Sequence, residues 1–213
     1  MAKKYKSNFQ KNRLYYFLIS LLLFNTIILE KLCASGAYDK GTATGKGRFE
    51  LSITINPLGI IPYGQNYGVL SYGLSTKMDL VGYYSSHQNG TQSQYIGLFY
   101  QFLSTNRLDL ATAIGFRNKN IGNWDIFCPQ LLYTFKLANN FSIGGSLVRV
   151  LEGNTYKNRG DALDITFYSP INVIKKINPK IKEAYLGIGT FKNASAAIPK
   201  DKLYIHYSLD LIF

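Results

Sequence analysis

Apolar and polar residues alternate with a period of two through most of this 213-residue chain, and this feature constrains the fold more than any other. The alternation is clearest where Phe49, Leu51, Ile53 and Ile55 are separated by polar residues. Successive side chains of a β-strand point to opposite faces, so the pattern predicts strands with one apolar and one polar face. We predict ten strands, near 48–56, 67–75, 77–85, 94–103, 107–117, 127–137, 140–151, 161–169, 182–191 and 203–213.

The predicted strands are long, because strands of soluble sheets usually have about five or six residues, whereas about 9–11 residues carry a tilted strand across a bilayer. The connections after the second, fourth and sixth strands are very short, and those after the odd-numbered strands are expected to have about nine to eleven residues. Such alternation is typical of transmembrane barrels, with tight periplasmic turns and longer external loops. We therefore predict an all-β fold, a transmembrane antiparallel up-and-down β-barrel over 48–213. Eight or twelve strands are the alternatives, if one predicted hairpin is in fact two strands fewer or two strands more.

The connection after the eighth predicted strand is an exception, because it is long, contains proline and carries four lysines between 170 and 182. An even number of strands places both termini on one side of the membrane, which in this class is the periplasmic side. Because this basic connection follows an even-numbered strand, it is expected on the periplasmic side as well. A solvated basic turn is the favoured interpretation, and a short amphipathic element on the membrane surface is the alternative.

The N-terminus predicts a cleaved secretory signal peptide over 1–36. A basic start is followed by an apolar run at 14–29 and by small residues at 34–37. The run of 16 residues is short of the roughly 20 that a spanning helix needs, which favours cleavage over an uncleaved anchor. Residues 37–47 are polar and rich in glycine, and we expect a loose periplasmic segment leading into the barrel. Without the leader, Cys128 is the only cysteine, so no intrachain disulfide is expected.

The net charge of +12 is partly a property of the leader. Residues 1–36 hold six of the 24 cations and one of the 12 acidic residues, which leaves +7 for the rest of the chain. No stripe of basic and aromatic residues marks a nucleic-acid-binding face, so nucleic acid is not an expected partner. With two histidines and one remaining cysteine at no ligand spacing, neither a metal nor any other cofactor is expected.

The end of the chain is its most specific feature, because an unbroken alternation of apolar residues stops on a terminal aromatic. The residues of this apolar face are Ile205, Tyr207, Leu209, Leu211 and Phe213. The pattern resembles the C-terminal signature of bacterial outer-membrane β-barrels, which serves as their assembly signal. The resemblance implies the outer membrane of a Gram-negative-type bacterium, recognition by the barrel assembly machinery, and contact with outer-membrane lipid and lipopolysaccharide.

If the apolar faces meet lipid, the polar faces line the interior. Charged side chains there must pair with one another or meet water. Arg149 instead falls on the apolar face, where its stem could extend to the headgroups. The two alternatives for the interior are a hydrogen-bonded plug of side chains and a thin passage for small solutes. The charged and histidine residues predicted to line it are Glu50, Asp79, Asp109, Arg117, Asp164, His206 and Asp210.

These features favour a non-enzymatic envelope protein, either a small porin-like channel or a structural barrel. The alternative is a lipid-modifying hydrolase, deacylase-like or phospholipase-like, with His87 or His206 as general base. His206, Ser208 and Asp210 share one strand face, but alternate residues lie about 7 Å apart along a strand, too far for direct proton relay. A third hypothesis, a surface adhesion module, is disfavoured because the predicted loops are only moderate in length.

Overall fold

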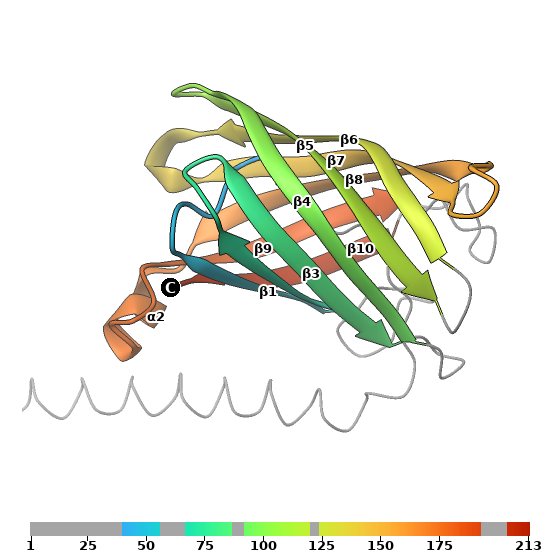
Figure 1. Cartoon of the computed structure of the whole chain (residues 1–213). Coiled ribbons are helices and arrows are strands. Elements are labelled where there is room, and N and C mark those ends of the chain that lie inside the picture. The colour runs from blue at the N-terminus through green and yellow to red at the C-terminus, as the bar shows by residue number, and fades with distance from the viewer. Residues whose placement is uncertain (1–39, 56–66, 87–91, 120–123, 193–203) are drawn as a thin grey trace, which may run out of the picture.

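The fold is a closed antiparallel β-barrel of ten strands, which confirms the prediction from the sequence. The computed structural model describes residues 40–55, 67–86, 92–119, 124–192 and 204–213. Each strand pairs with the next along the chain, and the last pairs with the first (Figure 1). The strands are β1 (Phe49–Ile55), β2 (Tyr67–Gly73), β3 (Met78–Ser86), β4 (Gln92–Ser104), β5 (Leu108–Lys119), β6 (Trp124–Lys136), β7 (Ser142–Glu152), β8 (Asn158–Pro170), β9 (Glu183–Lys192) and β10 (Tyr204–Ile212).

The seam between β1 and β10 closes the barrel. The two strands run antiparallel, with Ile53 opposite Leu209 and Leu51 opposite Leu211. The backbone N–H of the terminal Phe213 donates to the carbonyl of Phe49 at 2.8 Å. The apolar face of the last strand therefore continues the outer face of the first strand, and the described strands leave no free sheet edge.

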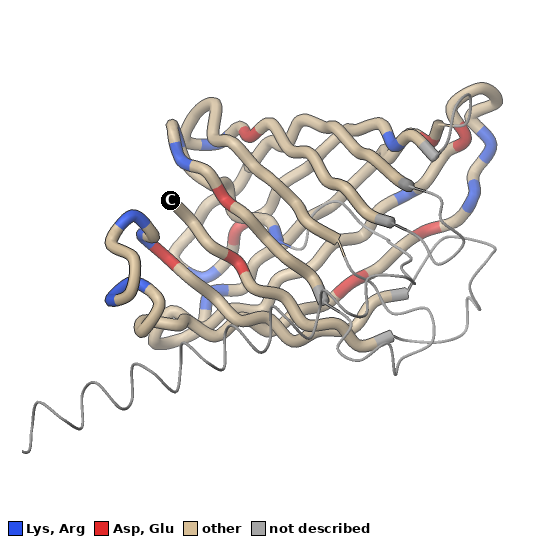
Figure 2. The backbone as a smooth tube through the Cα atoms, turned by 90° about the horizontal axis from the view of Figure 1, so that it is seen from below, with Lys and Arg blue, Asp and Glu red and all other residues tan. Residues whose placement is uncertain are grey.

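The strands bury one face and expose the other, as a period of two requires. In β2, for example, Val69 is 7% exposed whereas Leu70 is 53% exposed. Every strand contributes large apolar side chains to the outside of the barrel, and charged residues gather mainly toward its two ends (Figure 2). The exposed apolar residues include Ile53 of β1, Leu80 of β3, Ile96 and Leu98 of β4, Ile114 of β5, Leu131 of β6, Leu147 of β7, Ile165 of β8, Leu186 and Ile188 of β9, and Ile205 of β10.

The connections differ from the prediction at one end of the barrel. After β3, β5 and β7 they span residues 87–91, 120–123 and 153–157, which are five, four and five residues. The expected nine to eleven residues are therefore wrong at these three connections. Strands β4, β5, β6 and β8 are longer than predicted because pairing continues through polar residues at their ends, as where Leu151 pairs with Asn158.

At the opposite end, where β1 begins and β10 ends, the links include two short helical elements. They are η2 (Ala138–Asn140) and α2 (Asn172–Ile177). The segment favoured as a solvated turn thus contains a six-residue helix. No helix in the described ranges is both long and apolar enough to span a membrane.

Candidate functional site in the barrel interior

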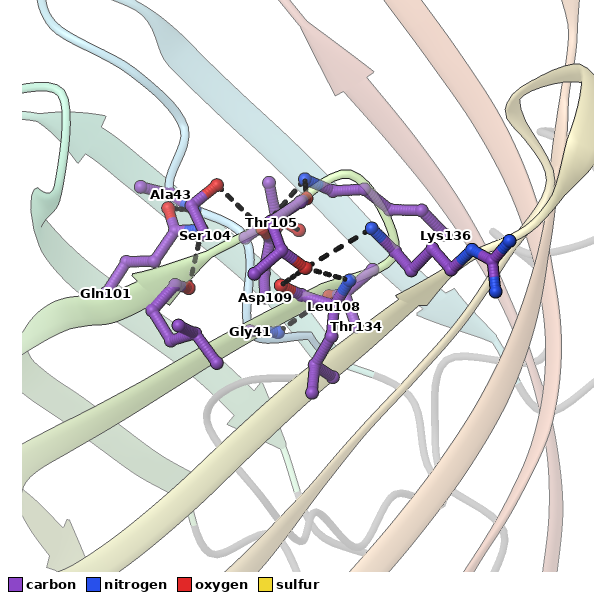
Figure 3. A network of polar contacts seen from close by, with 12 residues as sticks. Gly41, Ala43, Gln101, Ser104, Thr105, Leu108, Asp109, Thr134 and Lys136 are labelled. Carbon is purple, nitrogen blue, oxygen red and sulfur yellow. Dashed lines mark hydrogen bonds and ion pairs between the residues drawn. The ribbon is translucent and has the colours of Figure 1, made fainter.

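Residues 40–47, called the plug segment here, cross the interior of the barrel at the end where β1 begins and β10 ends. Four consecutive residues of this segment bond to side chains of four consecutive strands. Figure 3 shows two of these contacts, from Gly41 to Thr134 and from Ala43 to Gln101. The prediction of a loose segment is wrong for this part, because hydrogen bonds fix its backbone.

The bonds follow the strand order of the wall. Gly41 N donates to Thr134 Oγ1 of β6 at 2.9 Å, and Thr42 Oγ1 donates to Asp109 Oδ2 of β5 at 2.7 Å. Ala43 N donates to Gln101 Oε1 of β4 at 3.1 Å, and Thr44 N donates to Asp79 Oδ2 of β3 at 2.7 Å. Neighbouring strands lie about 4.8 Å apart and consecutive Cα atoms about 3.8 Å apart, so a chain running across the strands can reach one strand per residue.

Small residues make this path possible. A Cβ atom at Gly41 would lie 2.7 Å from Tyr133 Cα and 2.8 Å from the Leu132 carbonyl oxygen. Gly45 and Gly47 adopt φ values of 92° and 72°, which favour glycine, where the segment turns into β1. The sequence Gly–Thr–Ala–Thr–Gly at 41–45 suggests a flexible segment, but its small side chains allow the backbone to lie close against the barrel wall.

Lys40 anchors the start of the plug segment. Its ammonium contacts the carboxylate of Glu50 on β1 and lies 3.3 Å from Asp210 Oδ2 on β10. Ser52 Oγ donates to the other oxygen of Asp210 at 2.6 Å. Burial lowers the pKa of Lys40, but the charges of Glu50 and Asp210 raise it more, so its pKa lies above the ordinary value and the amine stays protonated.

Asp109 is a second anchor. It is fully buried and accepts hydrogen bonds from Thr42, from Ser104 at 2.8 Å and from the ammonium of Lys136 at 2.7 Å (Figure 3). A buried carboxylate needs such donors because desolvation of an unpaired charge is costly. The cluster therefore holds the plug segment against β4, β5 and β6.

Aromatic side chains fill the interior beyond the plug segment. Tyr67, Tyr83, Tyr95 and Phe127 form a continuous row with ring centroids 6.1, 5.2 and 5.4 Å apart. Tyr83 and Tyr95 stack almost in parallel, and Gln130 Nε2 donates to Tyr95 Oη at 3.2 Å. The rings leave room only for hydrogen at Gly115, where a Cβ atom would lie about 2.0 Å from Tyr95 Oη.

A buried ion pair adjoins this aromatic row. Arg117 Nη2 lies 2.6 Å from Asp125 Oδ2, and both side chains are at most 5% exposed. The guanidinium also lies over the ring of Phe127 at 4.7 Å. Arg159 of β8 reaches the second oxygen of Asp125 at 3.2 Å. Arg149, expected on the apolar face with its stem extending to the headgroups, is exposed and pairs with Asp161 at 2.9 Å.

The seven residues predicted to line the interior all lie there, and each is at most 7% exposed. The structure does not bring them to one site. Glu50, Asp79, Asp109 and Asp210 contact the plug segment or its neighbours, whereas Arg117 lies near the aromatic row. Asp164 accepts hydrogen bonds from Ser146 of β7.

His206 lies in the interior and away from the outer face. It is 1% exposed, shares a hydrogen bond of 2.8 Å with Thr166 and contacts the ring of Phe191 at a centroid distance of 5.9 Å. Ser208 Oγ has no hydrogen-bond partner in the described part of the chain. Ser208 is therefore not hydrogen-bonded to His206, whose hydroxyl partner is Thr166. His87 lies outside the described residues.

Sequence reasoning missed two features of the interior. Because only polar residues were expected to point inward, the buried aromatic side chains were not predicted. Tyr95 and Phe99 nevertheless lie on the same strand face as the buried Gln101. It also gave no sign that the plug segment enters the barrel. The number of strands could have indicated the buried aromatic side chains, since a barrel of ten strands is narrow enough for side chains to fill.

Two cavities border the plug segment within the described structure. The larger, about 340 Å³, is lined by Lys40, Lys136, Tyr168, Glu183 and Tyr185 among others, at the end of the barrel where the plug segment lies. The smaller, about 40 Å³, lies between the plug segment, β1 and β3. The described residues contain no group of three or more His, Cys, Asp or Glu side chains that could hold a metal ion.

Comparisons with known proteins assign no family. No protein-family model matches the chain, and no curated protein matches it. The solved structure of the KdgM porin is similar at 8% identity and a TM-score of 0.49, over 78% of this chain and 98% of that chain. A chain described under "Unveiling the Mechanism Behind the in-meso Crystallization of Membrane Proteins" is similar at 10% identity and a TM-score of 0.35, over 78% of this chain and 83% of that chain. The fold and its interior therefore define a class only: a closed ten-stranded antiparallel barrel with an apolar exterior.

Proposed function

We propose that this protein is a bacterial outer-membrane β-barrel that serves the envelope as a closed structural protein and not as an open porin-like channel. The observation that carries the proposal is the combination of a lipid-compatible exterior with a filled interior.

The exterior supports a position in a membrane. Large apolar side chains such as Leu70, Ile96 and Leu186 are at least half exposed, and similar residues occur on every strand. Soluble proteins rarely expose a continuous apolar surface of this extent. A closed barrel satisfies its backbone hydrogen bonds without water, which is the requirement for crossing lipid with strands.

The outer membrane is proposed from the sequence and not from the fold alone. The N-terminal pattern of 1–36 is typical of an export signal. The apolar face that ends on Phe213 resembles the assembly signal of outer-membrane barrels. We accordingly propose the barrel assembly machinery, outer-membrane lipid and lipopolysaccharide as partners.

The interior supports a closed barrel. A solute crossing it would have to displace the plug segment, which bonds to side chains of β1, β3, β4, β5, β6 and β10. It would then meet the row formed by Tyr67, Tyr83, Tyr95 and Phe127. Displacing the plug segment would take the Thr44 donor from the buried carboxylate of Asp79 and the Lys40 counter-ion from Glu50 and Asp210, which is energetically costly.

The proposal is tested by cell fractionation and by liposome swelling with the full-length chain. We expect the protein in the outer-membrane fraction and a faster-migrating band on an unboiled gel, which marks a folded barrel. Vesicles containing the folded barrel should not swell in small sugars or amino acids faster than empty vesicles. Size-dependent swelling would establish the porin-like alternative, and recovery in the soluble fraction would contradict both.

A further inference from the structure

The connection between β8 and β9 exposes apolar side chains at the end of the barrel where β10 finishes (Figure 1). Val173 and Ile177 are 42% and 55% exposed. They are four residues apart in α2 and therefore lie on one side of the helix. The strands leading to and from this connection also expose apolar residues, Phe167 on β8 and Leu186 on β9. The apolar pair is thus exposed beside strands that carry part of the apolar exterior.

The same connection carries positive charge that no described ion pair neutralises. Residues 171–182, called the basic connection here, contain no acidic residue. The described ion pairs near this end of the barrel use Lys40, Arg48 and Lys136, and none uses a lysine of the basic connection. The four exposed lysines are Lys175, Lys176, Lys180 and Lys182.

The backbone holds this connection close to the strands. Ile171 N donates to the Ala184 carbonyl at 2.8 Å, and Lys182 N donates to the Ile212 carbonyl at 2.7 Å. Ile181 is only 8% exposed. The basic connection is therefore held at the rim by both of its ends, where an embedded barrel passes from the acyl chains into the headgroup layer.

We propose that the basic connection binds anionic phospholipid headgroups of the leaflet at this end of the barrel. Val173 and Ile177 enter the boundary of the acyl chains, and the lysines contact phosphates. An apolar edge beside several lysines is the combination that holds interfacial helices on anionic bilayers. The inference rests on the proposed membrane location and adds a lipid class and a binding surface to it.

The test uses the full-length chain with Cys33→Ser, Cys128→Ser and Ile177→Cys, labelled with an environment-sensitive fluorophore. The barrel is folded into vesicles of phosphatidylcholine alone or with phosphatidylglycerol, and spin-labelled lipids of each type quench the fluorophore. Thr76→Cys, in the β2–β3 turn at the same end, is the control position. Lys175→Glu/Lys176→Glu removes the charge complementarity, and Lys175→Arg/Lys176→Arg retains it.

We expect spin-labelled phosphatidylglycerol to quench position 177 more strongly than spin-labelled phosphatidylcholine. One lysine near an anionic surface strengthens the attraction about fivefold. The Lys175→Glu/Lys176→Glu variant should therefore lower the preference for phosphatidylglycerol by about fivefold or more. Raising the salt to about 1 M, which shortens the Debye length to about 3 Å, should also weaken it. The arginine variant should behave as the parent.

Equal quenching by both lipids, unchanged by the reversal, would overturn the proposal and leave only apolar insertion. Absence of quenching at position 177 in a folded barrel would also overturn it, because the connection would then be solvated. Failure of the chain to give a folded band in any vesicle would instead count against the proposed membrane barrel itself.

Discussion

The ammonium nitrogen of Lys40 lies 3.3 Å from a carboxylate oxygen of Asp210, a residue 170 positions later in the chain. The same ammonium contacts Glu50, so one cation joins the plug segment to both strands of the closing seam. The Glu50 and Asp210 side chains are 7% and 3% exposed. One cluster of charges therefore links the plug segment to both strands of the closing seam.

Replacing Lys40 by alanine should destabilise the folded barrel by about 3 kcal/mol, because two buried carboxylates would lose their counter-ion. Denaturant titration in lipid vesicles measures this change. Lys46→Ala, at an exposed position of the same segment, should change stability by less than about 0.5 kcal/mol. Adding Glu50→Gln and Asp210→Asn to Lys40→Ala should recover part of the loss. An equal effect of the two lysine variants would contradict the role of this cluster.

The buried pair of Arg117 and Asp125 should show a larger coupling energy than the rim pair of Arg149 and Asp161. The first pair is at most 5% exposed and the second is 46–48% exposed, so solvent screens only the second. Double-mutant cycles with Arg→Met and Asp→Asn isolate each pairwise term. Since Arg159 also contacts Asp125, the cycle should be repeated in an Arg159→Met background. Equal coupling in the two pairs would argue against a dry interior around Arg117.

Gly115→Ala should destabilise the barrel by about 1–3 kcal/mol through overpacking. The added methyl group would overlap Tyr95, which stacks on Tyr83 with a centroid distance of 5.2 Å. Gly68→Ala is the matched control, because a Cβ atom there meets nothing within 4 Å. Thermal or denaturant unfolding of both variants measures the difference. A neutral Gly115→Ala would mean that the aromatic row is loosely packed.

The number and order of the strands could be predicted from the sequence because a lipid-facing strand must keep apolar residues at every second position. This rule gave strands close to the observed ones, such as β10 at Tyr204–Ile212. It placed strand ends less well, because pairing continues through polar residues such as Asn158, which follow no apolar alternation.

The interior could be predicted only in part. Charged residues such as Asp109 and Arg117 had to point inward, because an unpaired charge is costly in lipid. Alternation does not say what fills a narrow barrel, so the packing of Tyr95 against Tyr83 and Phe127 remained hidden. The path of residues 40–47 depends on contacts with residues that come as many as 170 positions later, for example between Thr44 and Asp79 and between Lys40 and Asp210. A short, glycine-rich segment carries no periodic signal for such contacts.

The most direct measurement of the closed interior is the conductance of the full-length, folded barrel in a planar lipid bilayer. We predict no steady conductance steps for the natural chain, because the plug segment and the aromatic row block the passage. A variant carrying Gly41→Val, Tyr83→Ala and Tyr95→Ala should open both obstructions and give steps, which shows that inserted barrels are detected. Steady steps from the natural chain, increasing with salt concentration, would contradict the closed barrel and establish an open channel.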